Sequence, residues 1–230
     1  QHVEGVPAIT GKKKPNLIGH SHGGPTVLYV AATQPQYIAS ITGVAGTYHG
    51  SKVADDIQNN SLTRTAFNIL GDYIIGPLIA LGQFKPELEI DFDASMKSLT
   101  QTGSNTLNAT VAQQVIKDGV LASTENCNKN LKQKDSKGIH YYSWTGVAQA
   151  TNALDIDTIL MQLGPLSYGS KDNDGMVSRC SAFMGKVIHD QYKLNHTDLA
   201  NMMFGLKGVF APDPVALYRQ HANRLKLEGL

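Results

Sequence analysis

The chain has 230 residues, of which 41% are hydrophobic and 17% are charged, so it can bury the core of one ordinary domain and is not a disordered segment. Lys and Arg number 20 and Asp and Glu number 19, and the net charge of +1 leaves no basic surface for a nucleic acid or an anionic membrane. The longest apolar run, over residues 74–82, contains Gly76 and Pro77 and is shorter than the ~18–20 residues that a membrane span needs.

The first part of the chain predicts a strand–helix–strand unit after a short helix. Apolar residues at helical spacing predict the short helix over residues 3–9. Short apolar runs predict buried strands over residues 16–18 and 38–45. Between them, a helix begins at Thr26 and must stop before Pro35. A crossover of this length predicts a right-handed unit with two parallel strands.

The rest of the chain has a mostly helical pattern. Residues 52–90 predict loosely amphipathic helices, and residues 93–124 are helical again. A run rich in aromatic and β-branched residues predicts another strand over residues 139–144. The last thirty residues predict mainly helix. Because no repeat or linker divides the chain, we expect a single α/β domain over residues 1–230.

Ser21 lies in a Gly-x-Ser-x-Gly sequence between the first predicted strand and the following helix. This context is typical of a nucleophile elbow, in which a strained serine projects its hydroxyl above the sheet. Gly19 and Gly23 are expected to leave space where side chains would clash. The amide of His22, at the helix N-terminus, is a candidate donor to an oxyanion. The alternative interpretation is a glycine-rich turn without catalytic function.

A serine nucleophile needs a neutral imidazole as its base, and the imidazole needs a carboxylate that fixes its tautomer. Of the eight histidines, we favour His196, which lies in a polar loop, over His221, which lies in a helical stretch. In this fold class the acid lies between the serine and the histidine in chain order. Asp174 fits that order, with Asp172 as the alternative, and either acid also suits a solvated turn.

Several stretches together resemble the bacterial true lipases of the Pseudomonas and Burkholderia type. They are NLIGHSHGGPT at residues 16–26, YYSW at 141–144, NDG at 173–175, NH at 195–196 and YRQHANRL at 218–225. The resemblance implies an α/β-hydrolase fold with a mostly parallel sheet, helices on both faces and a helical lid.

The resemblance also implies a secreted triacylglycerol lipase that hydrolyses long-chain acylglycerol esters at a lipid–water interface. Its triad would be Ser21, Asp174 and His196, with the backbone N–H of His22 in the oxyanion hole. Secretion would pass through the periplasm and would involve a lipase-specific foldase chaperone. No nucleic-acid partner is expected.

A structural Ca²⁺ ion is a further implication of the resemblance. Its ligands would be the carboxylates of Asp155 and Asp198 and the backbone carbonyl oxygens of Met202 and Leu206, since a hard dication prefers oxygen ligands. The ion would hold the loop that carries His196. From the residues alone, the two aspartates are more simply explained as helix-cap acids.

Cys127 and Cys180 are the only cysteines of the chain. Their number fits either two buried thiols or one disulfide in an exported protein. The resemblance implies the disulfide, because that family bonds one cysteine of the middle segment to another six residues after the triad aspartate.

A lid is expected over residues 65–90. The apolar side chains there would form a large exposed patch unless they were buried in the core or closed over the active site as a lid. They are Tyr73, Ile74, Ile75, Leu78, Ile79 and Leu81.

Two departures from the family pattern bear on activity. The second oxyanion donor of the family comes from a loop upstream of the serine, whereas Ser21 is preceded by only twenty residues, so we expect a chain that lacks N-terminal strands and is weakly active. The loop at residues 46–51 also differs around Tyr48, and we expect it to line the site and to alter substrate fit. The alternative functions are a carboxylesterase for short soluble esters and an inactive fragment of such an enzyme.

Overall fold

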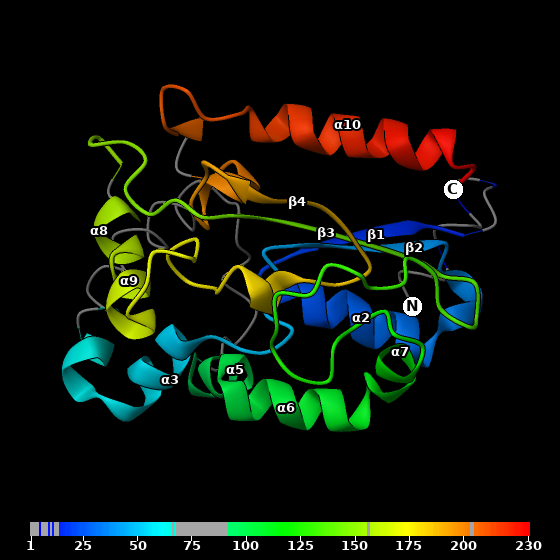
Figure 1. Cartoon of the computed structure of the whole chain (residues 1–230), viewed down its shortest axis with the longest axis horizontal. Helices are drawn as coiled ribbons and strands as arrows, with labels where there is room; N and C mark the ends of the chain where they lie inside the picture. The colour runs from blue at the N-terminus through cyan, green and yellow to red at the C-terminus, as the bar shows by residue number, and fades with distance from the viewer. Residues whose placement is uncertain are drawn as a thin grey trace.

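The computed structural model describes residues 14–65, 92–155, 157–202 and 205–230, together with residues 5, 9, 11 and 67. In this described part, a sheet of four parallel strands with the order β1-β2-β3-β4 forms the centre of the molecule (Figure 1). The strands are β1 (Asn16–His20), β2 (Ser40–Val44), β3 (His140–Gly146) and β4 (Lys186–Tyr192).

The predicted strand–helix–strand unit is confirmed. β1 and β2 pair in parallel, with Asn16 opposite Ser40, and helix α2 (Gly23–Thr33) connects them. The strand predicted over residues 139–144 is found as β3. β4 has no counterpart in the prediction, because most of its residues are exposed or half-buried and the strand therefore lacks an apolar run.

The remaining helices surround the sheet and are mostly short. They are α3 (Lys52–Asn59), α5 (Phe92–Leu99), α6 (Gln101–Thr110), α7 (Gln113–Lys117), α8 (Asp157–Met161), α9 (Leu163–Tyr168) and α10 (Pro214–Leu227), with 3₁₀ turns at Pro35–Tyr37, Cys180–Ala182 and Asp198–Ala200. Polar side chains begin several of them. Ser51 accepts a hydrogen bond from the N–H of Ala54 at the start of α3, and Asp213 accepts one from Val215 at the start of α10.

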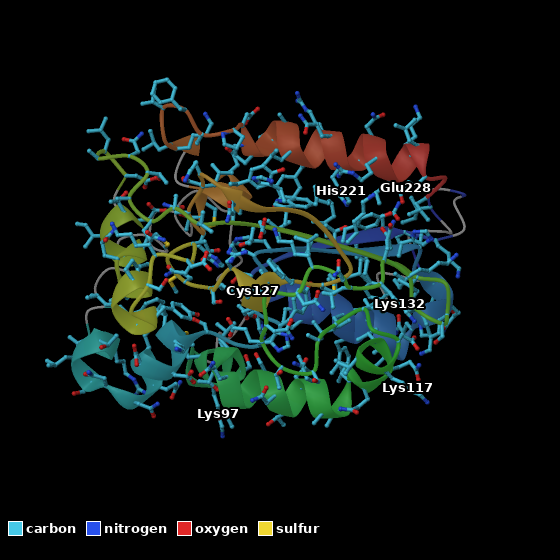
Figure 2. The ribbon with its side chains drawn as sticks, in the orientation of Figure 1. Lys97, Lys117, Cys127, Lys132, His221 and Glu228 are labelled. Carbon is cyan, nitrogen blue, oxygen red and sulfur yellow. A yellow bond between two sulfur atoms is a disulfide. The ribbon has the colours of Figure 1, made fainter. Side chains whose placement is uncertain are left out.

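Helices α2 and α10 cover opposite faces of the sheet (Figure 1). The core on the α2 side contains Leu28 of α2 packed with Ile41 and Tyr141. On the other face His221 of α10 points toward the strands (Figure 2), and a 2.8 Å hydrogen bond joins its Nε2 to Thr42 Oγ1. The neighbouring residues Ile41 and Thr42 of β2 therefore point to opposite faces of the sheet, as the two-residue period of a strand requires.

Two of the predicted segments lie outside the described residues. The helix over residues 3–9 is described only at residues 5 and 9, and the lid over residues 65–90 only at residues 65 and 67. Within the described ranges, no helix is long and apolar enough to cross a membrane.

Candidate active site

Ser21 directly follows β1 and has a left-handed backbone conformation, with a φ of 55°. Its N–H donates a hydrogen bond to the carbonyl oxygen of Val44 at 2.9 Å, which ties the turn to the end of β2. A non-glycine residue in this conformation is strained, and such strain is typical of a nucleophile elbow. The serine thus stands at the carboxyl end of the sheet.

The two glycines of the motif contribute differently to this turn. A Cβ at Gly19 would lie 2.1 Å from the carbonyl oxygen of Gly23, so no side chain fits at Gly19. A Cβ at Gly23 would meet no atom of the described residues within 4 Å, so against this part of the chain the expectation that both glycines avoid a clash is wrong for Gly23. Gly24 is the second crowded position, because its Cβ would lie 3.0 Å from the Cα of Gly46.

The structure brings Ser21, His196 and Asp174 together from three distant segments. The Nε2 of His196 lies 2.8 Å from Ser21 Oγ, and its Nδ1 lies 2.8 Å from Asp174 Oδ2. A carboxylate only accepts, so Nδ1 carries the ring hydrogen and Nε2 is free to accept the serine proton. The main chains of His196 and Asp174 are also hydrogen-bonded, since the N–H of His196 donates to the carbonyl oxygen of Asp174 at 2.8 Å.

Asp174 is completely buried, and backbone amides hold its carboxylate. Its Oδ1 accepts hydrogen bonds from the N–H of Met176 at 3.0 Å and from that of Val177 at 2.7 Å. The other carboxylate oxygen is thereby aimed at His196. The orientation of the acid is set by its own loop rather than by the histidine alone.

Asp172, the alternative acid, faces away from this relay. Its carboxylate pairs with the guanidinium of Arg179, with Oδ1 at 2.6 Å from Nε and Oδ2 at 2.9 Å from Nη2. The same arginine reaches Asp190 of β4 at 2.7 Å. Asp172 therefore belongs to an ion-pair network near the surface and not to the contact with His196.

His22 follows the serine and precedes the first turn of α2. Its ring turns toward α5, where Nε2 lies 3.1 Å from Ser98 Oγ, and burial holds the pKa of His22 below its ordinary value. The predicted oxyanion contact uses the backbone N–H and not this ring. That N–H stands at the N-terminus of an 11-residue helix, where the helix dipole favours negative charge.

A cluster of buried acids lies behind the histidine loop. Asp155 and Asp198 are almost fully buried, and each has one carboxylate oxygen without a hydrogen-bond partner among the described residues: Oδ2 of Asp155 and Oδ1 of Asp198. Asp157 is buried with them, and its Oδ2 likewise has no partner in the described part of the chain. Burial, and then the negative charges of Asp155 and Asp198, raise the pKa of Asp157 to about 8. The sequence prediction missed Asp157, although its spacing of two from Asp155 was a usable signal.

The acid cluster has some of the features of a cation site, but not a complete ligand set of side chains. Among the residues that the structure describes, no group of three or more His, Cys, Asp or Glu is placed so that it could hold a metal ion. Of the predicted carbonyl ligands, that of Met202 accepts a hydrogen bond from Gly205 at 3.0 Å, and Leu206 is half-buried nearby along the chain. The orphaned oxygens are nevertheless costly, since buried polar atoms normally find a partner.

The predicted disulfide between Cys127 and Cys180 is confirmed. It joins an exposed loop to the turn that follows the Asp174 loop. An ion pair of 2.7 Å between Lys129 and Asp190 supports the same loop. The bond thus tethers the segment that carries the acid to the middle of the chain.

The loop at residues 46–51 differs from the expectation at Tyr48. This side chain is 1% exposed and packs in the core between α2 and the sheet. Its ring lies against three backbone positions without side chains, Gly24, Gly43 and Gly46. Tyr48 is therefore a core residue, and this side chain of the loop does not line the site.

Comparison with known proteins gives the same fold. A family model for the alpha/beta hydrolase fold matches residues 6–179. A triacylglycerol lipase of Vibrio cholerae is 42% identical over 234 residues, covering 99% of this chain and 71% of the relative. A triacylglycerol lipase of Burkholderia plantarii is 32% identical over 260 residues, covering 100% of this chain and 70% of the relative.

Solved structures are more distant and support the fold alone. A lipase of Bacillus licheniformis in its mature form superposes with a TM-score of 0.55 at 15% identity, over 85% of this chain and 63% of that chain. Lipase 1 of Pelosinus fermentans gives a TM-score of 0.52 at 16% identity, over 92% and 71% respectively. The matches in sequence and the serine turn lead to one conclusion: the chain belongs to the α/β-hydrolase family, in the group of the bacterial triacylglycerol lipases.

Proposed function

We propose that this chain hydrolyses long-chain acylglycerol esters through an acyl-enzyme on Ser21, with His196 as the base and Asp174 as the group that orients it. The observation that carries the proposal is the pair of 2.8 Å contacts that places one imidazole between the serine hydroxyl and a buried carboxylate. Membership among the triacylglycerol lipases supports the substrate class.

The first half of the reaction forms the acyl-enzyme. Ser21 Oγ bonds to the ester carbonyl carbon while His196 Nε2 takes the hydroxyl proton, and the carbonyl oxygen becomes an oxyanion. The backbone N–H of His22 donates to that oxyanion at the helix N-terminus. When the intermediate collapses, the carbon–oxygen bond to the alcohol breaks and His196 returns the proton to the leaving alcohol.

The second half repeats these steps with water. His196 takes a proton from water as the water oxygen bonds to the acyl carbon, and the proton then passes to Ser21 Oγ as the fatty acid leaves. Asp174 remains ionised throughout and stabilises the imidazolium that forms twice in each cycle.

Labelling with a fluorophosphonate tests this proposal directly. We expect one adduct on Ser21, located by peptide mass spectrometry, and release of fatty acid from an acylglycerol emulsion by the unlabelled chain. A chain that neither reacts nor hydrolyses would support the inactive-fragment alternative. Activity on soluble p-nitrophenyl acetate without activity on tributyrin emulsion would support the short-chain carboxylesterase.

An apolar surface at the carboxyl end of the sheet favours a lipid–water interface as the partner. We define it by five exposed side chains on the loop after β3, on α8 and α9 and on the loop before α10. These segments lie at one end of the molecule (Figure 1). They are Leu154, Ile159, Leu166, Val209 and Phe210. Val209 and Phe210 are the most exposed, at 89% and 98%. Exposed apolar groups of this size mark interaction surfaces. Ser21 directly follows the carboxyl end of β1 and therefore stands at the same end of the sheet.

We expect the double substitution Val209→Ser/Phe210→Ser to lower the ratio of the rate on triolein emulsion to the rate on soluble p-nitrophenyl butyrate by about tenfold or more. Burying each of these side chains in lipid is worth about 1.5–3 kcal/mol. The matched control is Leu227→Ser, since Leu227 is 79% exposed at the opposite end of the molecule, where α10 ends (Figure 1). An equal drop in the ratio for Leu227→Ser would contradict the assignment of this surface.

We propose a structural Ca²⁺ ion at the acid cluster. Its ligands would be the carboxylates of Asp155 and Asp198 and the carbonyl oxygens of Met202 and Leu206. The orphaned carboxylate oxygens support the fit, because a dication would satisfy buried negative charge that the described residues leave without a partner. When bound, the ion would supply charge neutralisation and would stabilise the loop that holds His196, without taking part in the chemistry.

Calcium at about 100 times its dissociation constant is expected to raise the melting temperature by about 5–10 °C over the chelator-treated chain, which corresponds to about 2.7 kcal/mol. Asp198→Asn should abolish this response, whereas Asp213→Asn, at the exposed start of α10, should keep it. Differential scanning calorimetry with EDTA, with Ca²⁺ and with Mg²⁺ measures the effect. An Asp198→Asn chain that responds like the unsubstituted one would contradict the site.

Export is part of the proposal as well. A disulfide forms and persists in oxidising compartments, so the Cys127–Cys180 bond supports secretion through the periplasm. The lipase-specific foldase chaperone stays a prediction from the family resemblance.

A further inference from the structure

His20 is the last residue of β1 and stands directly before Ser21. Its ring Nε2 lies 2.8 Å from the carbonyl oxygen of His196, across 176 positions of sequence. Because a carbonyl oxygen only accepts, Nε2 must carry the hydrogen and His20 must be the Nε2–H tautomer. The steps of ester hydrolysis described above leave this histidine without a function.

The ring of His20 also packs against the ring of His196. Their centroids are 4.7 Å apart and their planes are tilted by 44°. Burial of the ring, and then the neighbouring charge of His196, lower the pKa of His20 to about 3. The ring therefore stays neutral at neutral pH and keeps a single donor for the carbonyl group.

The hydrogen bond from His20 completes the support of the base. The main chain of His196 is held on one side by its N–H bond to Asp174, and on the other side by its carbonyl bond to His20. Its ring contacts Asp174 and Ser21. His20 is the residue directly before Ser21, and its hydrogen bond reaches the segment that carries His196. The bond therefore fixes the segment of the nucleophile and the segment of the base relative to each other.

We propose that His20 is a positioning residue, which keeps His196 Nε2 within proton-transfer distance of Ser21 Oγ by holding the backbone carbonyl group of His196. This inference rests on the proposed function of the triad. The Nε2–H of His20 donates to the carbonyl oxygen of His196, so we assign no proton transfer to His20. A displacement of about 1 Å between reacting groups can cost about 10²-fold in rate, so the loss of one such bond matters.

The test compares His20→Ala with His20→Gln on a soluble ester. We expect His20→Ala to lower kcat by about 30–100-fold with KM within threefold, because the substitution misplaces the base and does not alter substrate contacts. His20→Gln should recover most of the loss, since its side-chain amide can donate to the same carbonyl oxygen. A residue that served packing alone would not show rescue by a donor of different shape.

His221→Gln is the matched control. His221 is also buried and also makes a 2.8 Å hydrogen bond through Nε2, but it extends from α10 to Thr42 in the middle of β2 and not to the segment of the base (Figure 2). We expect this variant to melt at a lower temperature with an unchanged kcat. Melting temperatures of all variants, and rates per serine titrated with fluorophosphonate, separate loss of fold from loss of positioning.

A second measurement does not depend on activity. Long-range ¹H–¹⁵N spectra of the unsubstituted chain should show His20 as the neutral Nε2–H tautomer between pH 5 and 8. An Nδ1–H tautomer, or a His20→Ala chain as fast as the unsubstituted one, would overturn the inference while the triad stands. An unsubstituted chain without hydrolysis or labelling would overturn the proposed function, and the inference with it.

Discussion

Replacing Asp174 with asparagine is expected to lower kcat by about 10⁴-fold with little change in KM. The amide group would present a donor where His196 Nδ1–H now finds an acceptor, and the ring would shift to the tautomer with hydrogen on Nε2. That hydrogen would then face Ser21 Oγ, so the imidazole could not take the serine proton. Steady-state hydrolysis of p-nitrophenyl butyrate measures the effect.

Asp172→Asn is the matched control for this substitution. The two acids are two positions apart, but Asp172 pairs with Arg179 and is half-exposed, whereas Asp174 is completely buried against His196. Asp172→Asn loses a partly exposed ion pair worth about 1 kcal/mol or less, and we expect its kcat to stay within a few-fold of the unsubstituted value. Equal losses for both substitutions would contradict the assignment of the acid.

This contrast shows where sequence reasoning succeeds at the site. The motif around Ser21 is local, and a strand, a turn and a helix in succession predict its geometry well. Chain order then places an acid and a histidine downstream. From the residues alone, however, Asp172 and Asp174 are equivalent turn acids, and only the fold decides which of them is buried next to His196.

The features that sequence reasoning missed depend on contacts between distant segments. β4 was not predicted, because most of its residues are exposed or half-buried and it lacks an apolar run. Its one buried residue, Asp190, is satisfied by Arg179 and Lys129, which a local pattern does not reveal. In the sequence, Asp157 is an ordinary acid at the start of a helix. The fold buries it beside Asp155 and Asp198.

A smaller error, at Tyr48, has the same origin. Tyr48 follows a strand and looks like a residue of the site rim, yet it fills the space that Gly24 and Gly43 leave in the core. The parallel pairing of β1 and β2, by contrast, followed from short apolar runs and crossover length, which are properties of the local chain.

Removing the Cys127–Cys180 disulfide is expected to lower the free energy of unfolding by roughly 4 kcal/mol, because the bond closes a long loop in the unfolded chain, with a sequence separation of 53. The rate of the folded enzyme should change less than twofold. The carboxylate of Asp174 keeps its bonds to the N–H groups of Met176 and Val177, which do not pass through the disulfide. Urea unfolding of Cys127→Ser/Cys180→Ser, followed by tryptophan fluorescence, measures the loss.

The reduced form of the unsubstituted chain provides the control for this variant, since it breaks the same bond without changing a side chain. If closure of the loop is the main cause of the stabilisation by the disulfide, the reduced chain and the double variant should share one urea midpoint. Reductant should then leave the midpoint of the variant unchanged. We expect Lys129 and Asp190 to keep their ion pair in both forms, so that the loop of Cys127 still contacts β4 after the bond is broken. A variant as stable as the oxidised chain would show that these noncovalent contacts already hold the Asp174 segment in place, and that the disulfide contributes little to stability.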